Sequence, residues 1–401
     1  MSKLDVQRDW AVIRAYLPPG YAELAIEHKA LRPHYPNVRI ETADELLRLI
    51  LLHVGADLPL RQTVAVVAES GGPEVSPYCL HMHMRTAGPY LGMLVAGMTS
   101  WRAECDPDKW NGYELVAVDG TSFGGRCASG TDARIHAALR LSDLAVLRAV
   151  TLGVESGETL RRFTWMPGQL AIGDRGYCNA PGIVWTVDQG ADVLVRLNRG
   201  ALPLLDDRGK PLDVLAWVRT VAQDEVVERA VLVDAVVDGD RRVVRGRLIA
   251  ARLPEDKAEE ARVRLRREQG RELTEESLEM AAYVVLFTTV PSTRLSAHWC
   301  MQAYRLRWQV ELLFKRWKSL CGFDRLPNER SDTIITWLTA KVLLGLLVDR
   351  IAAQTAPPLS PPQPERQAPG QTRHAHGPRT VESHGHRVVG RRRRAAPATI
   401  A

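Results

Sequence analysis

Four polar side chains on one predicted helix could together bind a phosphodiester. The segment YRLRWQVELLFKRWK (304–318) places Tyr304, Arg307, Glu311 and Lys318 at offsets of 0, 3, 7 and 14. At about 100° per residue they fall within an arc of about 60°. The carboxylate could bind a metal ion, while the two cations and the phenol could hold phosphate oxygens. The alternative is a structural face on which Glu311 forms only a surface ion pair with Arg307, and the helix alone leaves both interpretations open.

Two aspartates could complete a metal site with Glu311. Asp119 in VAVDGTS and Asp174 in AIGDRGY are each predicted to close a buried strand, close to a glycine that lets a ligand approach. Taken alone, each is more often a turn or cap residue. Three carboxylates suit two Mg²⁺ ions, because magnesium takes oxygen ligands and is held by a few carboxylates and substrate phosphate. Two such ions stabilise the attacking and leaving oxygens of a displacement at phosphorus.

The chain that would position these residues has the composition of a globular protein, but its last residues, 353–401, differ in charge from the rest. The 401 residues are 45% hydrophobic and 25% charged, enough for two or three domains. The net charge of +6 comes from residues 353–401, which hold eight arginines and two glutamates, so residues 1–352 are nearly neutral. Six scattered cysteines without a Cys-x-x-Cys pair argue against a zinc site and for a cytoplasmic protein. No apolar run is long enough to span a membrane, and the N-terminus lacks the apolar core of a signal peptide.

Residues 1–108 are predicted to form an all-helical N-terminal domain. TADELLRLILLHVG reads as a helix capped by Thr42. A helix over 60–69, a Gly-Gly-Pro turn and a helix opened by Ser76-Pro77 have helix–turn–helix spacing. This spacing indicates either DNA-end binding or plain helical architecture. The second helix carries His81, His83 and Arg85, which do not suggest a metal site.

Residues beyond 111 predict a mixed α/β unit. Short β-branched runs predict strands at 113–120, 133–141, 145–153, 169–177 and 192–198, with helices near 156–163 and 180–190. A β-rich insertion is predicted for 201–293, including one charged, exposed helix over 255–280. An apolar helix follows at 337–351. The Pro-, Arg- and His-rich tail, 353–401, is predicted to be disordered, and the change in composition also fits a frameshifted or degenerate end.

The spaced residues resemble a known family. Tyr304-x2-Arg307-x3-Glu311-x6-Lys318 is similar to the Tyr-Arg-Glu-Lys signature of bacterial insertion-sequence transposases of the IS-four type. VAVDGTS and AIGDRGY resemble the blocks around that family's two catalytic aspartates. The resemblance covers about residues 115–349 and is weakest across 201–293. It implies an RNase H-like mixed sheet flanked by helices, built from 111–200 and 294–352 and interrupted by the β-rich insertion.

The resemblance also implies a catalytic site and its metal. Asp119, Asp174 and Glu311 would be the catalytic acids and would bind two Mg²⁺ ions, with Mn²⁺ as the alternative metal. Other aspartates compete less well for these roles. Asp132 precedes a strand rather than ending one, and Asp188 and Asp192 bracket a helix end like caps.

The resemblance further implies DNA as the partner. Such enzymes cleave at the terminal inverted repeats of an element and join its ends to target DNA, as a homodimer in the synaptic complex. The protein would act in the bacterial cytoplasm and associate with the nucleoid when bound. The residues expected to contact DNA are Tyr304, Arg307 and Lys318 of the signature, and Arg175, Arg196 and Arg199 near strand ends. Some relatives form a hairpin and stack a flipped base on an aromatic residue. Tyr283 and Trp299 are the candidates here, with core packing as the alternative.

Two rival functions follow from the same residues. One is a degenerate transposase that binds terminal repeats without cutting them, because the chain turns into the Pro/Arg tail after Ile351, where relatives carry more folded helix. The other is a nuclease that cuts DNA but never joins it.

Overall fold

The computed structural model describes most of the chain up to residue 355. The described residues are 6–31, 40–99, 110–124, 133–153, 157–269, 273–323, 326 and 331–355. The predictions for Asp132 and for the tail from residue 356 onward therefore lie outside the described residues. Residues 353–355, which were assigned to the tail, instead end a helix.

The first described segments are helical, as predicted. The helices are α1 (Val6–Ala15), α2 (Tyr21–Glu27), α3 (Ala43–Gly55), α4 (Leu60–Glu69), α5 (Pro77–Met84) and α6 (Gly88–Thr99). Thr42 caps α3 in a capping box with Glu45, because its hydroxyl accepts from the Glu45 N–H while the Glu45 carboxylate accepts from the Thr42 N–H. The helix–turn–helix spacing of α4 and α5 is confirmed, and Ser76 caps α5. His83 is buried, with Nδ1 3.0 Å from the Ala30 carbonyl oxygen, so it packs inside the helices.

The strands that follow form the first half of one nine-stranded sheet. They are β1 (Glu114–Phe123), β2 (Ala133–Arg140), β3 (Val146–Gly153), β4 (Gln169–Gly173) and β5 (Asp192–Arg196). All five were predicted. β1, β4 and β5 run parallel, while β2 pairs antiparallel with β1 and β3 pairs antiparallel with β2. The helix predicted near 180–190 is α7 (Ala180–Asp188), but the helix predicted over 156–163 is only a 3-10 turn at Leu160–Arg162. It stops there because Phe163 is already extended.

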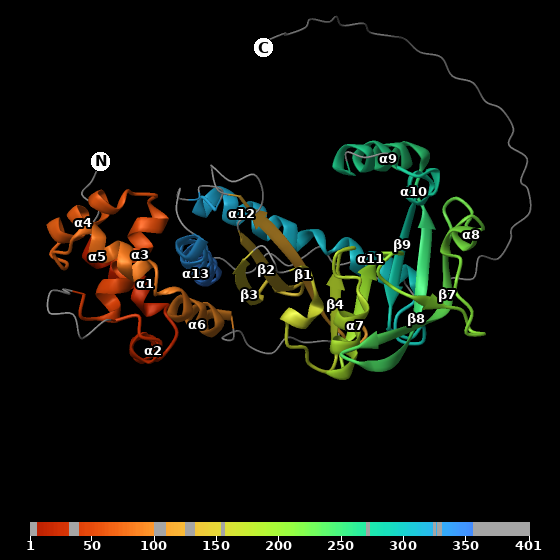
Figure 1. The fold of residues 1–401 in the computed structure, drawn as a ribbon, viewed down its shortest axis with the longest axis horizontal. Helices are drawn as coiled ribbons and strands as arrows, with labels where there is room; N and C mark the ends of the chain where they lie inside the picture. Colours follow the sequence, from red (N-terminus) through yellow and green to blue (C-terminus); the bar gives the residue numbers. More distant parts are fainter. Residues whose placement is uncertain are drawn as a thin grey trace, which may run out of the picture. The chain divides into compact units, whose positions relative to one another are not determined.

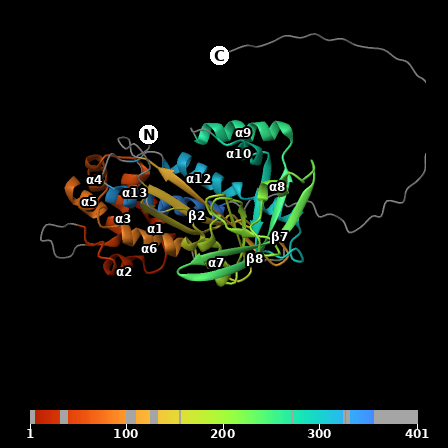
Figure 2. The ribbon, with the colours of Figure 1, turned by 45° about the vertical axis from the view of Figure 1, so that its right-hand side comes forward.

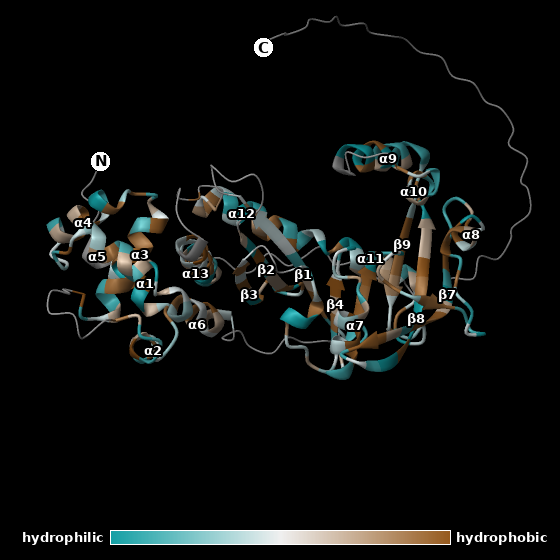
Figure 3. Ribbon diagram, viewed as in Figure 1, coloured by the Kyte–Doolittle hydropathy of each residue, from teal (hydrophilic) through white to brown (hydrophobic). Residues whose placement is uncertain are grey.

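The segment 201–293 continues the same sheet. It contributes β6 (Leu204–Leu205), β7 (Val226–Val237), β8 (Asp240–Arg252) and β9 (Tyr283–Thr288), with α8 (Val214–Val218) before β7. The strand order is β3-β2-β1-β4-β5-β9-β8-β7-β6, so β9 joins this segment to β5. The charged stretch predicted as one helix is two, α9 (Glu255–Gln269) and α10 (Glu275–Met280). Figure 3 shows α9 mostly in the hydrophilic colour, as expected for a helix with almost no buried side chains.

The last described helices cover one face of the sheet, and α7 covers the other. They are α11 (Ala297–Arg305), α12 (Trp308–Cys321) and α13 (Ser331–Thr355). One hydrophobic core joins α3–α6, α12 and α13 to Leu115 and Ala117 of β1, and the other joins α7 and α8 to Val116 and Val118. Successive strand residues point to opposite faces. The odd-numbered residues of β1, including Asp119, therefore face α12. Figure 1 shows α13 between the N-terminal helices and the strands β2 and β3, and Figure 2 shows α12 beside β2.

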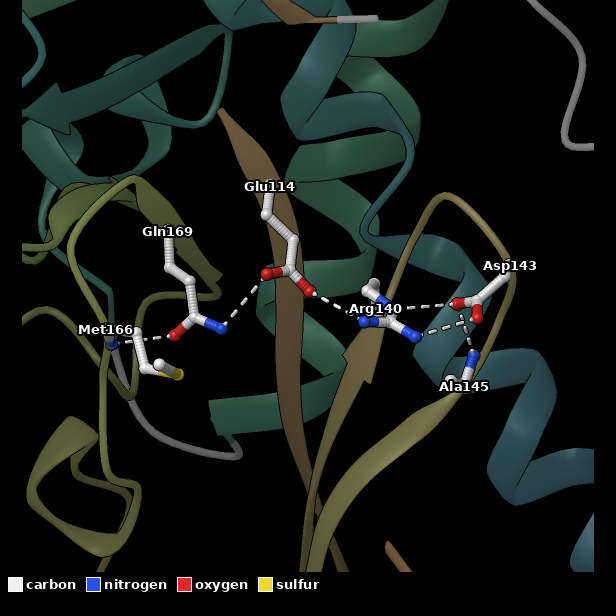
Figure 4. Close-up of polar contacts among 6 residues, drawn as sticks. All are labelled: Glu114, Arg140, Asp143, Ala145, Met166 and Gln169. Carbon is white, nitrogen blue, oxygen red and sulfur yellow. Dashed lines mark hydrogen bonds and ion pairs between the residues drawn. The ribbon is translucent and has the colours of Figure 1, made fainter. Parts of the chain in front are cut away.

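A polar network fixes the strands at the end of β1 that lies away from Asp119. Arg140 donates to both carboxylate oxygens of Asp143 at 3.0 Å and to Glu114 at 3.3 Å. Gln169 donates to the other oxygen of Glu114 at 3.3 Å, and Asp143 also accepts from the Ala145 N–H (Figure 4). Because Arg140 is buried, these charge-assisted bonds tie the ends of β1, β2 and β4 into one register.

In the part of the chain that the structure describes, no helix combines the length and apolarity needed to cross a bilayer.

A buried lysine links the N-terminal helices to α12. Lys341 of α13 has no exposed surface, and its Nζ donates to Asp57 Oδ1 and to the Cys321 carbonyl oxygen, both at 2.7 Å. Asp57 follows α3, and Cys321 is the last residue of α12. The ammonium also lies 5.2 Å from the centroid of the Trp337 ring. One side chain thus ties three elements together.

Lys341→Met is expected to lower the free energy of unfolding by about 3 kcal/mol, because the partly buried Asp57 carboxylate and a helix-end carbonyl both lose their cation. Urea unfolding followed by circular dichroism measures the change. Lys315→Met on the exposed side of α12 is the matched control and should change stability by about 0.5 kcal/mol or less. Equal effects of the two substitutions would contradict the assigned role of Lys341.

Candidate active site

The two aspartates lie at one end of the parallel part of the sheet. Asp174 directly follows Gly173, the last residue of β4, as predicted. Asp119 does not close β1, so that prediction was wrong. The strand continues to Phe123 because it forms a hairpin with β2, whereas its pairing with β4 ends at Ala117 opposite Ile172. Asp119 therefore lies just beyond the point where β4 stops pairing with β1.

The predicted single helix over 304–318 is interrupted. Tyr304 belongs to α11, and Arg307 lies in the turn that opens α12. The N–H groups of Leu306, Arg307 and Val310 each donate to the carbonyl three residues earlier, at 3.1 Å, so the backbone tightens to a 3-10 turn here. The assumed rotation of about 100° per residue is therefore wrong across this turn, and the 60° arc does not describe the four side chains. Apolar residues hold α12 against the core, since Val310, Leu313, Phe314 and Trp317 are buried.

Arg307 brings Glu311 and Asp119 together despite the interruption. Its guanidinium forms an ion pair with Glu311 and lies 3.8 Å from Asp119 Oδ2. The side chains of Arg307 and Asp119 are 17% and 14% exposed, whereas that of Glu311 is 43% exposed. A cation between two carboxylates from β1 and α12 is more than a surface pair, because two of the three side chains are mostly buried.

Burial and the neighbouring charges shift the pKa of Asp119. Burial raises the pKa of Asp119 to about 7. The Gly120 N–H, which donates to Oδ1 at 2.8 Å, and the Arg307 guanidinium lower that pKa, while the negative charges of Asp174 and Glu311 raise it. The three predicted acids are therefore close enough to influence one another.

Tyr304 and two of the predicted arginines gather beside Asp174. Burial raises the pKa of Tyr304, the nearby Arg307 and Arg196 lower it, and Asp174 raises it. Partial desolvation lowers the pKa of Arg175, and the positive charge of Arg196 lowers it further. Arg196 is the last residue of β5, so the cations come from the ends of two neighbouring strands. This places positive charge and a phenol hydroxyl next to the acids.

Lys318 and Arg199 occupy the margins of the group. Lys318 Nζ lies 5.2 Å from the centroid of the Phe123 ring, at the far end of β1. Arg199 follows β5 and lies 3.5 Å from the Glu276 carboxylate of α10. Both remain partly exposed, so either could reach a phosphate.

The competing residues have structural partners. Asp188, the last residue of α7, pairs with Arg242, and Asp192 accepts from the Tyr113 and Thr289 hydroxyls at 2.5 and 2.6 Å. Asp192 begins β5 and thus lies away from the strand ends that carry the site. Tyr283 is buried in β9, and Trp299 packs edge-on against Trp110 with ring centroids 5.3 Å apart. Both aromatic residues are used in packing.

A fourth acid beside the site was missed by the sequence analysis. Glu158 precedes the 3-10 turn before β4, and burial and then the charge of Asp174 raise its pKa, while Arg134 lowers it. Its Oε2 and Asp174 Oδ1 lie 1.6 and 3.3 Å from the position that a Cβ on Gly176 would occupy. The only local sequence signal for this acid is Gly176 in AIGDRGY, because a glycine there leaves the space that the Glu158 carboxylate fills.

The acids supply the type of ligand that a hard divalent cation requires, although they are not arranged around one. Among the described residues, no three acidic, histidine or cysteine side chains are close enough together to hold a metal ion. At this site the Arg307 guanidinium pairs with Glu311 and lies 3.8 Å from Asp119. The donor set consists of carboxylate oxygens, the type of ligand that Mg²⁺ and Mn²⁺ prefer.

Comparison with known proteins agrees with the residue pattern. Residues 110–347 match the family described as "Transposase DDE domain". The chain is 30% identical over 319 residues to the putative transposase InsL for insertion sequence element IS186A of Escherichia coli (strain K12), covering 78% of this chain and 85% of that protein. It is 30% identical over 320 residues to the transposase for insertion sequence element IS421 of Escherichia coli, with the same coverage. A transposase for element IS231F of Bacillus thuringiensis subsp. israelensis is 25% identical over 215 residues, covering 48% and 42%.

Proposed function

The chain belongs to the transposase DDE domain family, and we propose that Asp119, Asp174 and Glu311 are the acids that serve its DNA cleavage and joining reactions. The chain is a DNA transposase of an insertion sequence, with DNA as its substrate and a dependence on a divalent metal.

The strand order supports an RNase H-like core. β3, β2, β1, β4 and β5 form a mixed sheet whose first three strands are antiparallel and whose last three are parallel. Acids on β1, after β4 and on the helix α12 packed against β1 come together at one end of it. This core comprises 111–200 and 294–352, and 201–293 is the β-rich insertion that extends the sheet.

The single observation that carries the catalytic assignment is the Arg307 bridge. It holds Glu311 of α12 against Asp119 of β1, while Asp174 lies close enough to raise the pKa of Asp119. Asp119, Asp174 and Glu311 would together hold two Mg²⁺ ions, or Mn²⁺ ions. When bound, two such ions stabilise the negative charge on the attacking and leaving oxygens at phosphorus.

The chain's own residues position the DNA around these acids. Tyr304, Arg307 and Lys318 bind phosphates flanking the scissile one, and Arg175, Arg196 and Arg199 extend the positive edge along the ends of β4 and β5. Arg307 leaves its bridging position between the acids when it binds a phosphate. Asp119, mostly buried, is held by the Gly120 N–H and keeps its orientation during this change.

The assembly follows from the reaction. Cutting both ends of an element and joining them to one target brings two terminal inverted repeats together, and a homodimer supplies one active site per end. The N-terminal helices, residues 1–108, would bind the repeats through the helix–turn–helix formed by α4 and α5, with Arg85 at the end of α5.

Full-length protein is expected to nick and linearise a supercoiled plasmid carrying two inverted repeats, in Mg²⁺ but not in EDTA, and to join the released ends to a target plasmid. Gel analysis of the products measures cleavage and joining separately. End binding without cleavage would show a degenerate transposase and overturn the proposal. Cleavage without joined products would show a hydrolytic nuclease.

A further inference from the structure

The carboxylate of Glu158 lies between the two glycines that follow the catalytic aspartates. Its Oε1 is 3.4 Å from the position that a Cβ on Gly120 would occupy, and its Oε2 is 1.6 Å from the corresponding position on Gly176. Any side chain at Gly176 would therefore displace Glu158. Gly120 follows Asp119 by one residue, and Gly176 follows Asp174 by two, so both aspartate motifs leave room for the same carboxylate.

The backbone around Glu158 is fixed by side chains. Arg162 Nε and Nη2 donate to the Gly157 carbonyl at 3.1 and 2.8 Å, and Asn179 Nδ2 donates to the Glu158 carbonyl at 3.2 Å. Trp165 Nε1 donates to the Leu160 carbonyl at 3.1 Å. Three carbonyls within four residues are thus held from outside the segment. Glu158 is placed by this scaffold rather than by contacts of its own side chain.

The Glu158 side chain itself has no comparable partner. Within the described ranges its carboxylate forms neither a hydrogen bond nor an ion pair, although it is only partly exposed and faces the carboxylate of Asp174. A half-buried charge beside a like charge is unfavourable for folding, and the nearby positive charge of Arg134 offsets part of this cost without a direct ion pair. A rigid scaffold that presents such a group is typical of a position where a cation binds.

We propose that Glu158 is a fourth metal-binding carboxylate of this site, acting with Asp174 on one of the divalent ions. The inference rests on the proposed function, because Asp174 is its partner. Two octahedral ions require more oxygen ligands than three carboxylates and a phosphate supply, and water or a further carboxylate must complete them. Glu158 provides that carboxylate from the strand-end side, opposite Glu311 on α12.

Mn²⁺ binding to the full-length protein without DNA tests the proposal, measured by electron paramagnetic resonance of the free ion. Glu158→Gln keeps the size of the side chain and the carbonyl bonds of the segment, and it should weaken binding about 10-fold. Gly176→Ala should weaken binding similarly, because its Cβ would displace the Glu158 carboxylate although all four acidic residues are still present. Glu260→Gln on the exposed surface of α9 is the matched control and should bind Mn²⁺ as the wild type does.

The outcomes separate this inference from the proposed function. Wild-type Mn²⁺ affinity in both Glu158→Gln and Gly176→Ala would overturn the role of Glu158. Wild-type affinity in Asp174→Asn would instead overturn the metal site as a whole. Circular dichroism checks that each variant is folded. If Glu158→Gln fails to fold, Gly176→Ala decides the question alone.

Discussion

Glu311→Gln is expected to reduce the rate of Mg²⁺-dependent DNA cleavage by at least about 10³-fold, equivalent to about 4 kcal/mol of transition-state stabilisation. The amide has almost the same size as the carboxylate but cannot supply its negative charge to a metal ion. Folding should be nearly unaffected, because Glu311 is 43% exposed and the Arg307 guanidinium keeps Asp119 as an acidic neighbour at 3.8 Å. The loss should therefore be catalytic rather than structural.

Three measurements on the same preparation distinguish these effects for Glu311→Gln. Plasmid cleavage gives the rate, thermal unfolding gives the stability, and a mobility shift with terminal-repeat DNA gives binding. Binding should be kept, since removing a negative charge does not repel phosphate. Glu260→Gln, the same chemical change on exposed α9, should cleave at the wild-type rate. Undiminished cleavage by Glu311→Gln would refute the assignment of Glu311 as a catalytic acid.

Asp119→Asn is expected to abolish cleavage and at the same time to stabilise the metal-free protein above neutral pH. The pKa of Asp119 is about 7 in the folded protein, against an ordinary value of 3.8. The folded state therefore binds the proton more tightly than the unfolded state, and stability falls as the pH rises from about 4 to about 7. Asparagine has no charge to bury and can still accept from the Gly120 N–H. The Asp119→Asn substitution should therefore abolish this pH-dependent loss of folding stability, which amounts to a few kcal/mol.

Thermal unfolding in EDTA at pH 5, 6.5 and 8 measures this prediction. The melting temperature of Asp119→Asn should exceed that of the wild type most at pH 8, and the difference should shrink toward pH 5. Added Mg²⁺ should raise the melting temperature of the wild type at pH 8 but not that of the variant. Asp188→Asn, which removes an exposed ion pair with Arg242, should show neither effect. A pH-independent difference between Asp119→Asn and the wild type would refute the burial of Asp119 as its cause.

The strands and most helices followed from local sequence. Thr42 and Ser76 marked helix starts because hydroxyl caps act within three residues, and β-branched runs marked all five strands of the core. The errors lay where tertiary contacts override local preference. The strand containing Asp119 runs on because β2 pairs with it, and the long helix tightens at Arg307 while that side chain reaches across to Asp119.

The sequence alone determined the family, the order of the three proposed catalytic acids and the cations that accompany them, because residue types and spacings carry that information directly. Only the tertiary structure decided how these residues meet. It brought Arg307 between Asp119 and Glu311, and it gathered Arg175 and Arg196 beside Asp174. It also revealed Glu158, whose partners Gly120 and Gly176 lie 38 and 18 residues away in the chain. No local pattern encodes such a contact, because it depends on where separate strands end in space.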